Sequence, residues 1–249
     1  MKDIYINCLK KLREFRKSLK NDIDIKRGKL YFTWIKDKTE IIKNEKDDNY
    51  IYLNIIKHTL PKYVITQYTF NKSNKKVKSI IKANYTFMGS KYRFSNKNIS
   101  NEDVKILLKY VLFKRGNVVW LDFGFNVGNE FGGMHPAVIL KNFEKDLFVL
   151  PISSKKPIEY VRIEKDFENG KITQEECEKQ KNEITEIMEL TNINGFKNML
   201  RWARITRMKK VSILRLNFNG TIGTLDGQDM NTIADKICLE FGNNINKFS

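Results

Sequence analysis

The feature that most limits the fold is a series of short apolar runs in the second half of the chain, separated by turn residues. The runs occupy residues 117–123, 136–143, 147–153, 158–164 and 199–213. Their length and their β-branched and aromatic content predict strands. In the first run, Val118 and Trp120 lie on one face and Val119 on the other, so both faces are expected to be partly buried. Strands of this kind predict a small barrel.

Helices are expected to decorate this barrel, which makes the fold class α+β. Thr173 and Glu176 form a capping box, so one helix is expected inside an insertion at about 165–195. Its inner stripe would consist of Cys177, Ile184, Ile187 and Met188. Asp226 is the expected cap of a terminal helix that stops at Gly242.

The formal net charge of +17 is concentrated in the first half of the chain. Residues 1–112 hold 26 Lys and Arg against 11 Asp and Glu, a net of +15, whereas residues 113–249 hold 20 against 18, a net of +2. This contrast predicts two domains, 1–112 and 113–249. The excess indicates a polyanionic partner, either nucleic acid or an anionic membrane surface. A lysine-rich solvated face is the alternative.

The first domain is expected to mix helix and strand. Apolar residues at helical spacing predict an amphipathic helix near 3–20, and the run at 63–70 is strand-like. Residues 70–78 are expected to form a basic loop, and Gly89 with Ser90 to turn a hairpin. The domain should close with a helix capped by Ser100. Its role is either to extend a nucleic-acid-binding track or to serve as a docking or regulatory domain.

Cysteines and targeting signals point to a soluble, cytoplasmic protein. Cys8, Cys177 and Cys238 are odd in number and form no C-x-x-C pair, so neither a disulfide framework nor a zinc site is expected. The first residues lack the apolar stretch of a signal peptide, and no run approaches the roughly 18 apolar residues of a membrane-spanning helix. We expect no metal and no cofactor.

One segment carries a specific resemblance. KRGNVVWLDFGFNVGNEFGGMHPAVILKN, residues 114–142, resembles the start of the PemK/MazF toxins, ribonucleases of toxin–antitoxin systems. Their usual pattern is a K-R-G-[DE] start, a G-S-E-x-G-G-x-R-P loop and a second strand that ends near an Asn. The residues in register are Gly116, Gly128, Glu130, Gly132, Gly133, Pro136 and Asn142. The resemblance continues more faintly through 147–154 and 204–213 and into the terminal helix, while 1–112 lie outside it.

The resemblance implies an SH3-like barrel of the PemK/MazF type, usually a homodimer bound by an antitoxin, that cuts single-stranded RNA without a metal. Such cleavage must remove the proton of a ribose 2′-OH, stabilise charge at phosphorus and protonate the leaving 5′ oxygen. Gly132 and Gly133 can present backbone N–H groups to a phosphate, although plain turn chemistry is the alternative.

His135 stands where the family has its catalytic arginine. An imidazole can give and take protons but lacks the permanent charge and the donor fork of a guanidinium. The replacement therefore either makes His135 the acid or base, or abolishes catalysis. Ser153 falls at the place of the family's catalytic Thr or Ser, and Ser154 takes that place if the register slips by one residue.

Residues 197–215 contain seven basic residues and no acidic one. Trp202 is expected to stack on a base, and Arg204 and Arg207 to replace the missing arginine charge. The alternative is a solvated face with Trp202 in the core. The loop and strand ends supply the remaining candidates for substrate binding, which are Asn129, Glu130, Asn142 and Ser154.

The expected insertion has the opposite charge. Residues 164–189 contain nine Asp and Glu and four Lys, a net of −5. We hypothesise that this acidic segment shields the basic strand in the resting protein; a charged surface helix is the alternative.

Two functions follow from the sequence. The first is a toxin-like endoribonuclease that depends on His135 and Ser153. The second is a non-catalytic module on the same barrel that binds nucleic acid or a partner protein, because relatives of this fold poison gyrase and the barrel alone does not fix the chemistry.

Overall fold

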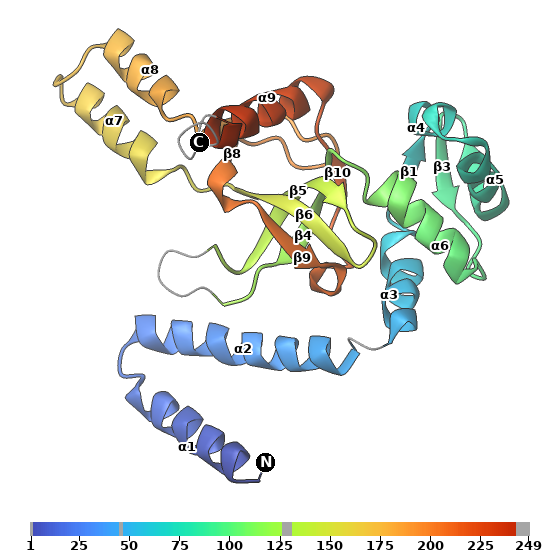
Figure 1. Ribbon diagram of the computed structural model, residues 1–249, viewed down its shortest axis with the longest axis horizontal. Helices are drawn as coiled ribbons and strands as arrows, with labels where there is room; N and C mark the ends of the chain where they lie inside the picture. Colours follow the sequence, from blue (N-terminus) through green and yellow to red (C-terminus); the bar gives the residue numbers. More distant parts are fainter. Residues whose placement is uncertain (1, 45–46, 126–130, 243–249) are drawn as a thin grey trace. The chain divides into compact units, whose positions relative to one another are not determined.

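The computed structural model describes residues 2–44, 47–125 and 131–242 (Figure 1). The chain forms two compact units. Unit 1 consists of residues 1–46 and 123–133, and unit 2 of residues 47–122 and 134–249. Residues 47–112 thus share a unit with the large sheet, and the expected domain boundary near residue 112 stays a prediction.

Unit 1 contains a pair of helices, α1 (Lys2–Ser18) and α2 (Asp22–Asn44). The expected helix near 3–20 is confirmed. Tyr31 of α2 makes edge-on ring contacts with Phe15 of α1 at 5.4 Å and with Phe125 at 5.2 Å between centroids. Gly28 is buried against Leu19, where an added Cβ would lie 2.2 Å from a methyl group. An aromatic cluster and one close helix contact therefore hold this unit together.

Unit 2 begins with a small sheet and its helices. The elements are α3 (Asp48–Asn54), a π-helical turn (Ile55–Thr59), β1 (Val64–Thr66), α4 (Gln67–Lys72), α5 (Lys75–Asn84), β2 (Tyr85–Met88), β3 (Lys91–Phe94), α6 (Asn101–Leu107) and a second π-helical turn (Leu108–Leu112). The strands are antiparallel in the order β1-β3-β2. The hairpin at Gly89 and Ser90 and the Ser100 cap of α6 are both confirmed.

Two expectations in this region were wrong in detail. The strand at 63–70 is only β1, because the Thr66 side chain accepts a hydrogen bond from the Thr69 N–H and caps α4. The basic loop expected at 70–78 contains the end of α4 and the start of α5. Asn74 caps α5, and Val77 begins a buried stripe, so the lysines lie on the solvent side of a helix.

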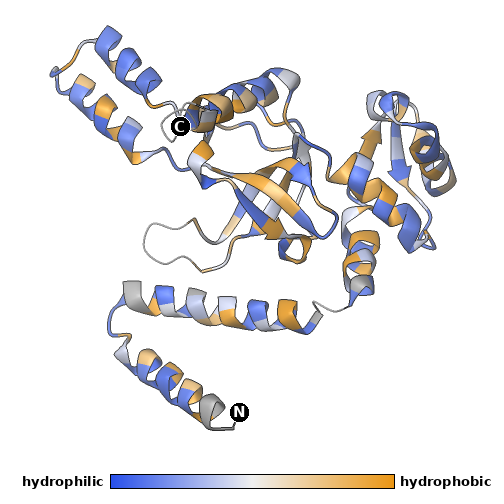
Figure 2. Cartoon of the chain, in the orientation of Figure 1, coloured by the Kyte–Doolittle hydropathy of each residue, from blue (hydrophilic) through white to orange (hydrophobic). Residues whose placement is uncertain are grey.

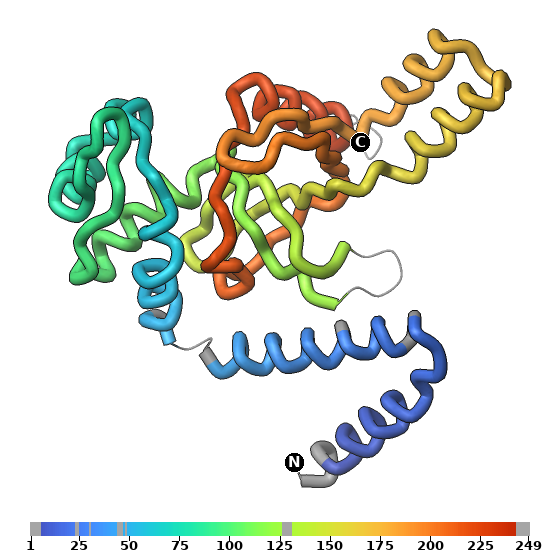
Figure 3. Tube along the Cα trace, turned by 180° about the vertical axis from the view of Figure 1, so that it is seen from behind, coloured from blue at the N-terminus to red at the C-terminus, as the bar shows by residue number. Residues whose placement is uncertain are grey.

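A seven-stranded antiparallel sheet forms the centre of unit 2. Its strands are β4 (Asn117–Asp122), β5 (Met134–Asn142), β6 (Asp146–Ser153), β7 (Ile187–Leu190), β8 (Arg201–Arg204), β9 (Lys209–Ser212) and β10 (Gly223–Thr224). The order is β10-β4-β5-β6-β8-β7, and β9 also pairs with β6. The sheet curls into a half-barrel, which Figure 3 shows from behind. The strands expected at 117–123, 136–143 and 147–153 are confirmed, and the SH3-like detail stays a prediction.

The insertion between β6 and β7 contains α7 (Ile158–Glu168) and α8 (Gln174–Glu183). The strand expected at 158–164 was wrong, because this segment forms a helix after Pro157 that packs its buried Tyr160 against Ile187 and Trp202. The capping box of Thr173 is confirmed. Of the expected inner stripe only Cys177 is buried in α8, since the helix ends before Ile187 and Met188, which lie in β7.

The last helix, α9 (Gly227–Ile237), closes the core on one face of the sheet. The Asp226 side chain accepts a hydrogen bond from the Asp229 N–H, which confirms the expected cap. Met230 and Ile233 pack among buried strand residues such as Leu150. Figure 2 shows hydrophobic residues along β5 and β6 and hydrophilic ones along α8. Burying one aliphatic side chain fully contributes about 1.5–3 kcal/mol relative to leaving it exposed, so the packing of α9 stabilises the core of unit 2.

Candidate active site

The register of β5 and β6 places the two catalytic candidates at the same end of the two strands. The pair nearest the start of β5 is Ala137 with Pro151. His135 lies two residues before Ala137 in β5 and Ser153 two residues after Pro151 in β6, so both lie just beyond the last paired residues of the two strands. Side chains alternate along a strand, so His135 shares its face with Ala137 and Ser153 shares its face with Pro151. Residues that face each other in an antiparallel pair point to the same side of the sheet. The imidazole and the hydroxyl therefore share one face.

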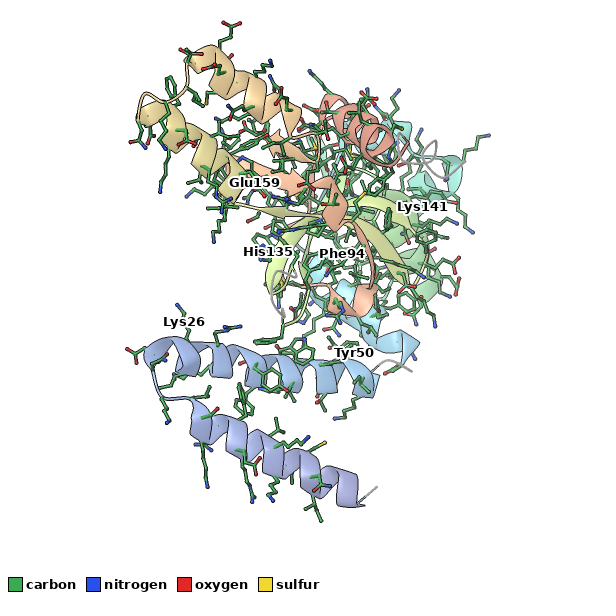
Figure 4. The ribbon with its side chains drawn as sticks, turned by 60° about the vertical axis from the view of Figure 1, so that its left-hand side comes forward. Lys26, Tyr50, Phe94, His135, Lys141 and Glu159 are labelled. Carbon is green, nitrogen blue, oxygen red and sulfur yellow. The ribbon has the colours of Figure 1, made fainter. Side chains whose placement is uncertain are left out.

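His135 is held by the strand on its other side. It pairs with Leu121 of β4, and Pro136 after it is buried. The histidine itself is half-buried (Figure 4). The ring is therefore fixed by strand pairing at its base and is not sealed in the core.

The glycine pair ahead of His135 closes a turn within unit 1. Gly133 has φ of 82°, a left-handed conformation that favours glycine. Its N–H donates to the Gly124 carbonyl at 2.6 Å, and its carbonyl accepts from the Phe123 N–H at 2.9 Å. This N–H is thus already used, which supports the turn interpretation for Gly133. Asn129 and Glu130, and with them Gly128, lie outside the described residues.

Ser153 is half-buried, and its Oγ accepts a hydrogen bond from the Lys155 N–H at 3.0 Å. The bond fixes the oxygen and leaves the hydroxyl hydrogen to be donated. Ser154 is exposed next to it. Ser153 also pairs with Trp202, so the end of β6 is held by β8.

Trp202 belongs to the core. Only 8% of its surface is exposed, and it packs with Tyr160 of α7 and Ile187 of β7. Its Nε1 donates to a Glu189 carboxylate oxygen at 3.4 Å. A ring covered in this way offers little face to a nucleotide base, so the structure supports the core alternative for Trp202.

Arg204 lies on the same face of β8 as Trp202, but two carboxylates already bind it. Its Nη2 is 2.7 Å from a Glu159 oxygen of α7, and its Nη1 pairs with Glu186. Burial opposes ionisation of Glu159, yet the hydrogen bond and the charge of Arg204 outweigh it and hold the pKa of this carboxyl below its usual range. The arginine charge beside the end of β6 is therefore neutralised by the segment before β8.

Asn142 and Arg207 are not brought to the same place. Asn142 ends β5, about 23 Å from His135 at roughly 3.3 Å per residue. Its Oδ1 accepts from the Glu144 N–H at 2.8 Å, so it forms the turn into β6. Arg207 is exposed in a 3₁₀ turn after β8.

One cation that the sequence alone did not distinguish lies beside β4, the strand that pairs with His135. Leu121, the β4 partner of His135, forms a bridge on its other side with Leu216. The preceding residue, Arg215, is half-buried, and its Nη1 donates to the Asp122 carbonyl at 3.1 Å. Arg215 was one of seven basic residues in its segment, and only the bridge to β4 distinguishes it. Its guanidinium therefore bonds the last residue of β4, whose strand partner Met134 directly precedes His135.

The described ranges contain no group of three or more His, Cys, Asp or Glu side chains that is suited to a metal ion. Within the same ranges, no helix has the length and apolar content that crossing a bilayer requires.

Comparison with known proteins defines the class. Residues 114–241, about half of the chain, match the family described as PemK-like, MazF-like toxin of type II toxin–antitoxin system. The chain therefore belongs to this toxin family, as its sequence motif predicts. Residues 1–113 lie outside the matched region. No curated protein matches the chain.

Two solved structures are similar to about half of the chain. The Mycobacterium tuberculosis toxin MazF-mt6 is 12% identical with a TM-score of 0.31, and covers 50% of this chain and 95% of its own. MazF (Form-I) from Deinococcus radiodurans is 14% identical with a TM-score of 0.34, and covers 52% and 96%.

Proposed function

We propose that this protein is a toxin endoribonuclease that cuts single-stranded RNA without a metal ion. The observation that supports the proposal is that His135 and Ser153 lie at the same end of β5 and β6, each two residues beyond the last pair, Ala137 with Pro151, and on one face of the sheet. Membership of the PemK/MazF family supports the reaction class. The family also suggests an antitoxin protein as partner, a homodimer and a cytoplasmic location.

In the proposed reaction, neutral His135 accepts the proton of a ribose 2′-OH. The 2′ oxygen then bonds to the adjacent phosphorus, and the bond from phosphorus to the 5′ oxygen breaks. The imidazolium returns its proton to that 5′ oxygen, which leaves a 2′,3′-cyclic phosphate and a free 5′-hydroxyl.

Two further groups would stabilise the charge that develops on phosphorus. The Ser153 hydroxyl donates to a non-bridging oxygen, since its Oγ is already oriented by the Lys155 N–H. Arg215 supplies the permanent charge that a histidine lacks. Arg204 is less suited to this role while Glu159 and Glu186 bind it.

The test is incubation of the full chain with mixed-sequence single-stranded RNA in EDTA. We expect discrete cuts with cyclic phosphate ends, and a rate at least ~10²-fold lower for His135→Ala, because the variant lacks the acid–base group. His58→Ala is the matched control, since His58 is the other histidine and lies in the turn after α3. Cutting that survives His135→Ala, or tight RNA binding without cutting, would contradict the proposal.

A further inference from the structure

A polar cavity of about 500 Å³ lies in unit 2, and neither His135 nor Ser153 lines it. It is formed by the segment from Thr59 to Thr69, Lys91, the start of β4 and the loops at 194–195 and 220–224. Asn117 at this cavity begins β4, whereas Leu121 next to His135 is four residues further along, roughly 13 Å at about 3.3 Å per residue. The cavity is therefore a separate site.

Three lysines, Lys62, Lys91 and Lys114, line this cavity, and no Asp or Glu is among the described residues that do so. Lys62 Nζ is positioned by the Asn219 carbonyl at 3.3 Å and by its Oδ1 at 3.0 Å. In the described part of the chain, neither Lys91 nor Lys114 lies within ion-pair distance of a carboxylate. Gathering like charges without a counter-charge is unfavourable, and an anionic ligand would reverse that cost.

The remaining lining suits a nucleotide rather than a bare anion. Thr69 and Thr221 contribute hydroxyl groups and Asn194 a side-chain amide. Tyr68 lines the cavity with 69% of its surface exposed, so its ring is available for stacking. A volume of about 500 Å³ lies within the range of small-ligand sites and exceeds what a phosphate alone would fill.

Hydrogen bonds between distant segments hold the cavity walls in place. Thr59 Oγ1 donates to the Phe218 carbonyl at 3.1 Å. Buried Asn117 donates to the Val111 and Leu112 carbonyls at 2.7 and 2.9 Å. Its Oδ1 accepts from Thr224 Oγ1 at 3.2 Å. The site is thus formed before any ligand arrives, which lowers the entropic cost of binding.

We propose that this cavity, the lysine pocket, binds a nucleotide through its 5′-phosphate. The lysines hold the phosphate, and Tyr68 and Asn194 contact the base. The source of that phosphate is either a free mononucleotide or the 5′-phosphorylated end of an RNA. The proposal does not depend on the ribonuclease activity.

The test is calorimetric titration of the full chain in EDTA with adenosine and uridine 5′-monophosphates and with the two nucleosides. We expect saturable binding of the monophosphates, and binding of the nucleosides that is at least tenfold weaker. The double variant Lys91→Gln/Lys114→Gln should lose at least tenfold in affinity for the monophosphates. Lys57→Gln/Lys82→Gln is the matched control, because both of its lysines are exposed in unit 2 and line none of this cavity.

Two further arms identify the source of the phosphate and the part played by the base. A 2′-O-methyl oligoribonucleotide, which cannot be cut, is compared with and without a 5′-phosphate. Tighter binding of the phosphorylated oligomer than of the mononucleotides assigns the pocket to RNA ends, and the reverse order assigns it to free nucleotides. Tyr68→Ala should weaken nucleotide binding at least threefold and leave the weak binding of inorganic phosphate unchanged.

No saturable binding of any monophosphate, or equal binding by the lysine variant and its control, would overturn the proposal. RNA cutting by the same lysine variant is measured separately. If the nucleotide does not bind but RNA is still cut, the pocket proposal is wrong and the nuclease proposal is unaffected. If RNA is not cut but the nucleotide binds, the reverse holds.

Discussion

His135 stands where the family has an arginine, so a positive charge is missing there. Removing Arg215 tests whether this residue supplies that charge. Replacing it with Gln should slow RNA cleavage by about 10²-fold, because a permanent positive charge beside the phosphate is lost. The measurement is the single-turnover cleavage rate, accompanied by the free energy of unfolding, since the guanidinium also bonds the Asp122 carbonyl.

Arg162→Gln is the control, because Arg162 is an exposed arginine on α7. Arg215→Lys should recover part of the rate. A rate for Arg215→Gln that matches the control would remove Arg215 from the proposed site.

The candidate site was predictable from the sequence only as far as the motif reached. His135 and Ser153 follow from the PemK/MazF pattern, but their placement at the same end of β5 and β6 depends on strand register. That register passes through a bulge between Ile139 and Lys141, which no local pattern indicates. The burial of Trp202 depends on α7, a helix that alternation in seven residues had suggested as a strand.

At the scale of elements, the cap of α9 is a sharp test of what holds the core closed. Asp226→Ala removes the acceptor of the Asp229 N–H and should lower the free energy of unfolding by about 1 kcal/mol. Denaturant unfolding measures the change. Asp235→Ala, an exposed charge later in the same helix, should stay within about 0.5 kcal/mol of the parent, and a loss as large as that of Asp226→Ala would argue against the cap.

The carboxylates that bind Arg204 turn the shielding hypothesis into a prediction about two residues. Glu159→Gln/Glu186→Gln should raise the affinity for a non-cleavable single-stranded RNA about fivefold, because Arg204 is released toward the face of Ser153. Filter binding at fixed salt measures the change.

The control for this pair is Glu183→Gln, an exposed residue at the end of α8. The lowered pKa of Glu159 also sets the direction with pH. The ion pair is present at neutral pH and is lost only as pH falls through that lowered value. An unchanged RNA affinity in the double variant would contradict the shielding hypothesis and favour the alternative, a charged surface helix.

Caps and strands were predictable because their chemistry is local. Ser100, Thr173 and Asp226 each satisfy an N–H group within three residues, and the sequence contains that whole interaction. The segments at 70–78 and 158–164 were assigned wrongly because tertiary packing decided between two patterns that a short stretch fits equally well.

At the scale of the whole molecule, the net charge of +17 predicts a strong salt dependence of RNA binding. Log affinity should fall linearly with log salt, with a slope of about −0.7 for each phosphate contacted. We expect Lys26→Gln/Lys29→Gln, two exposed positions on α2, to make that slope shallower by about 1.4.

Lys165→Gln/Lys179→Gln, which changes two lysines of the acidic insertion, is the matched control. An unchanged slope in the α2 variant would assign the charge of unit 1 to docking or regulation rather than to an RNA track.

Strand β6 pairs with β5 on one side and with β8 and β9 on the other, and the insertion separates it from the last two. On the ribosome, β6 therefore emerges with one edge exposed until residues 201–212 have been translated. An unpaired hydrophobic strand edge can form hydrogen bonds with the edge of another nascent chain. The next stretch to be translated, 164–189, carries a net charge of −5. Charged residues close to a hydrophobic strand oppose its pairing with the edges of other chains.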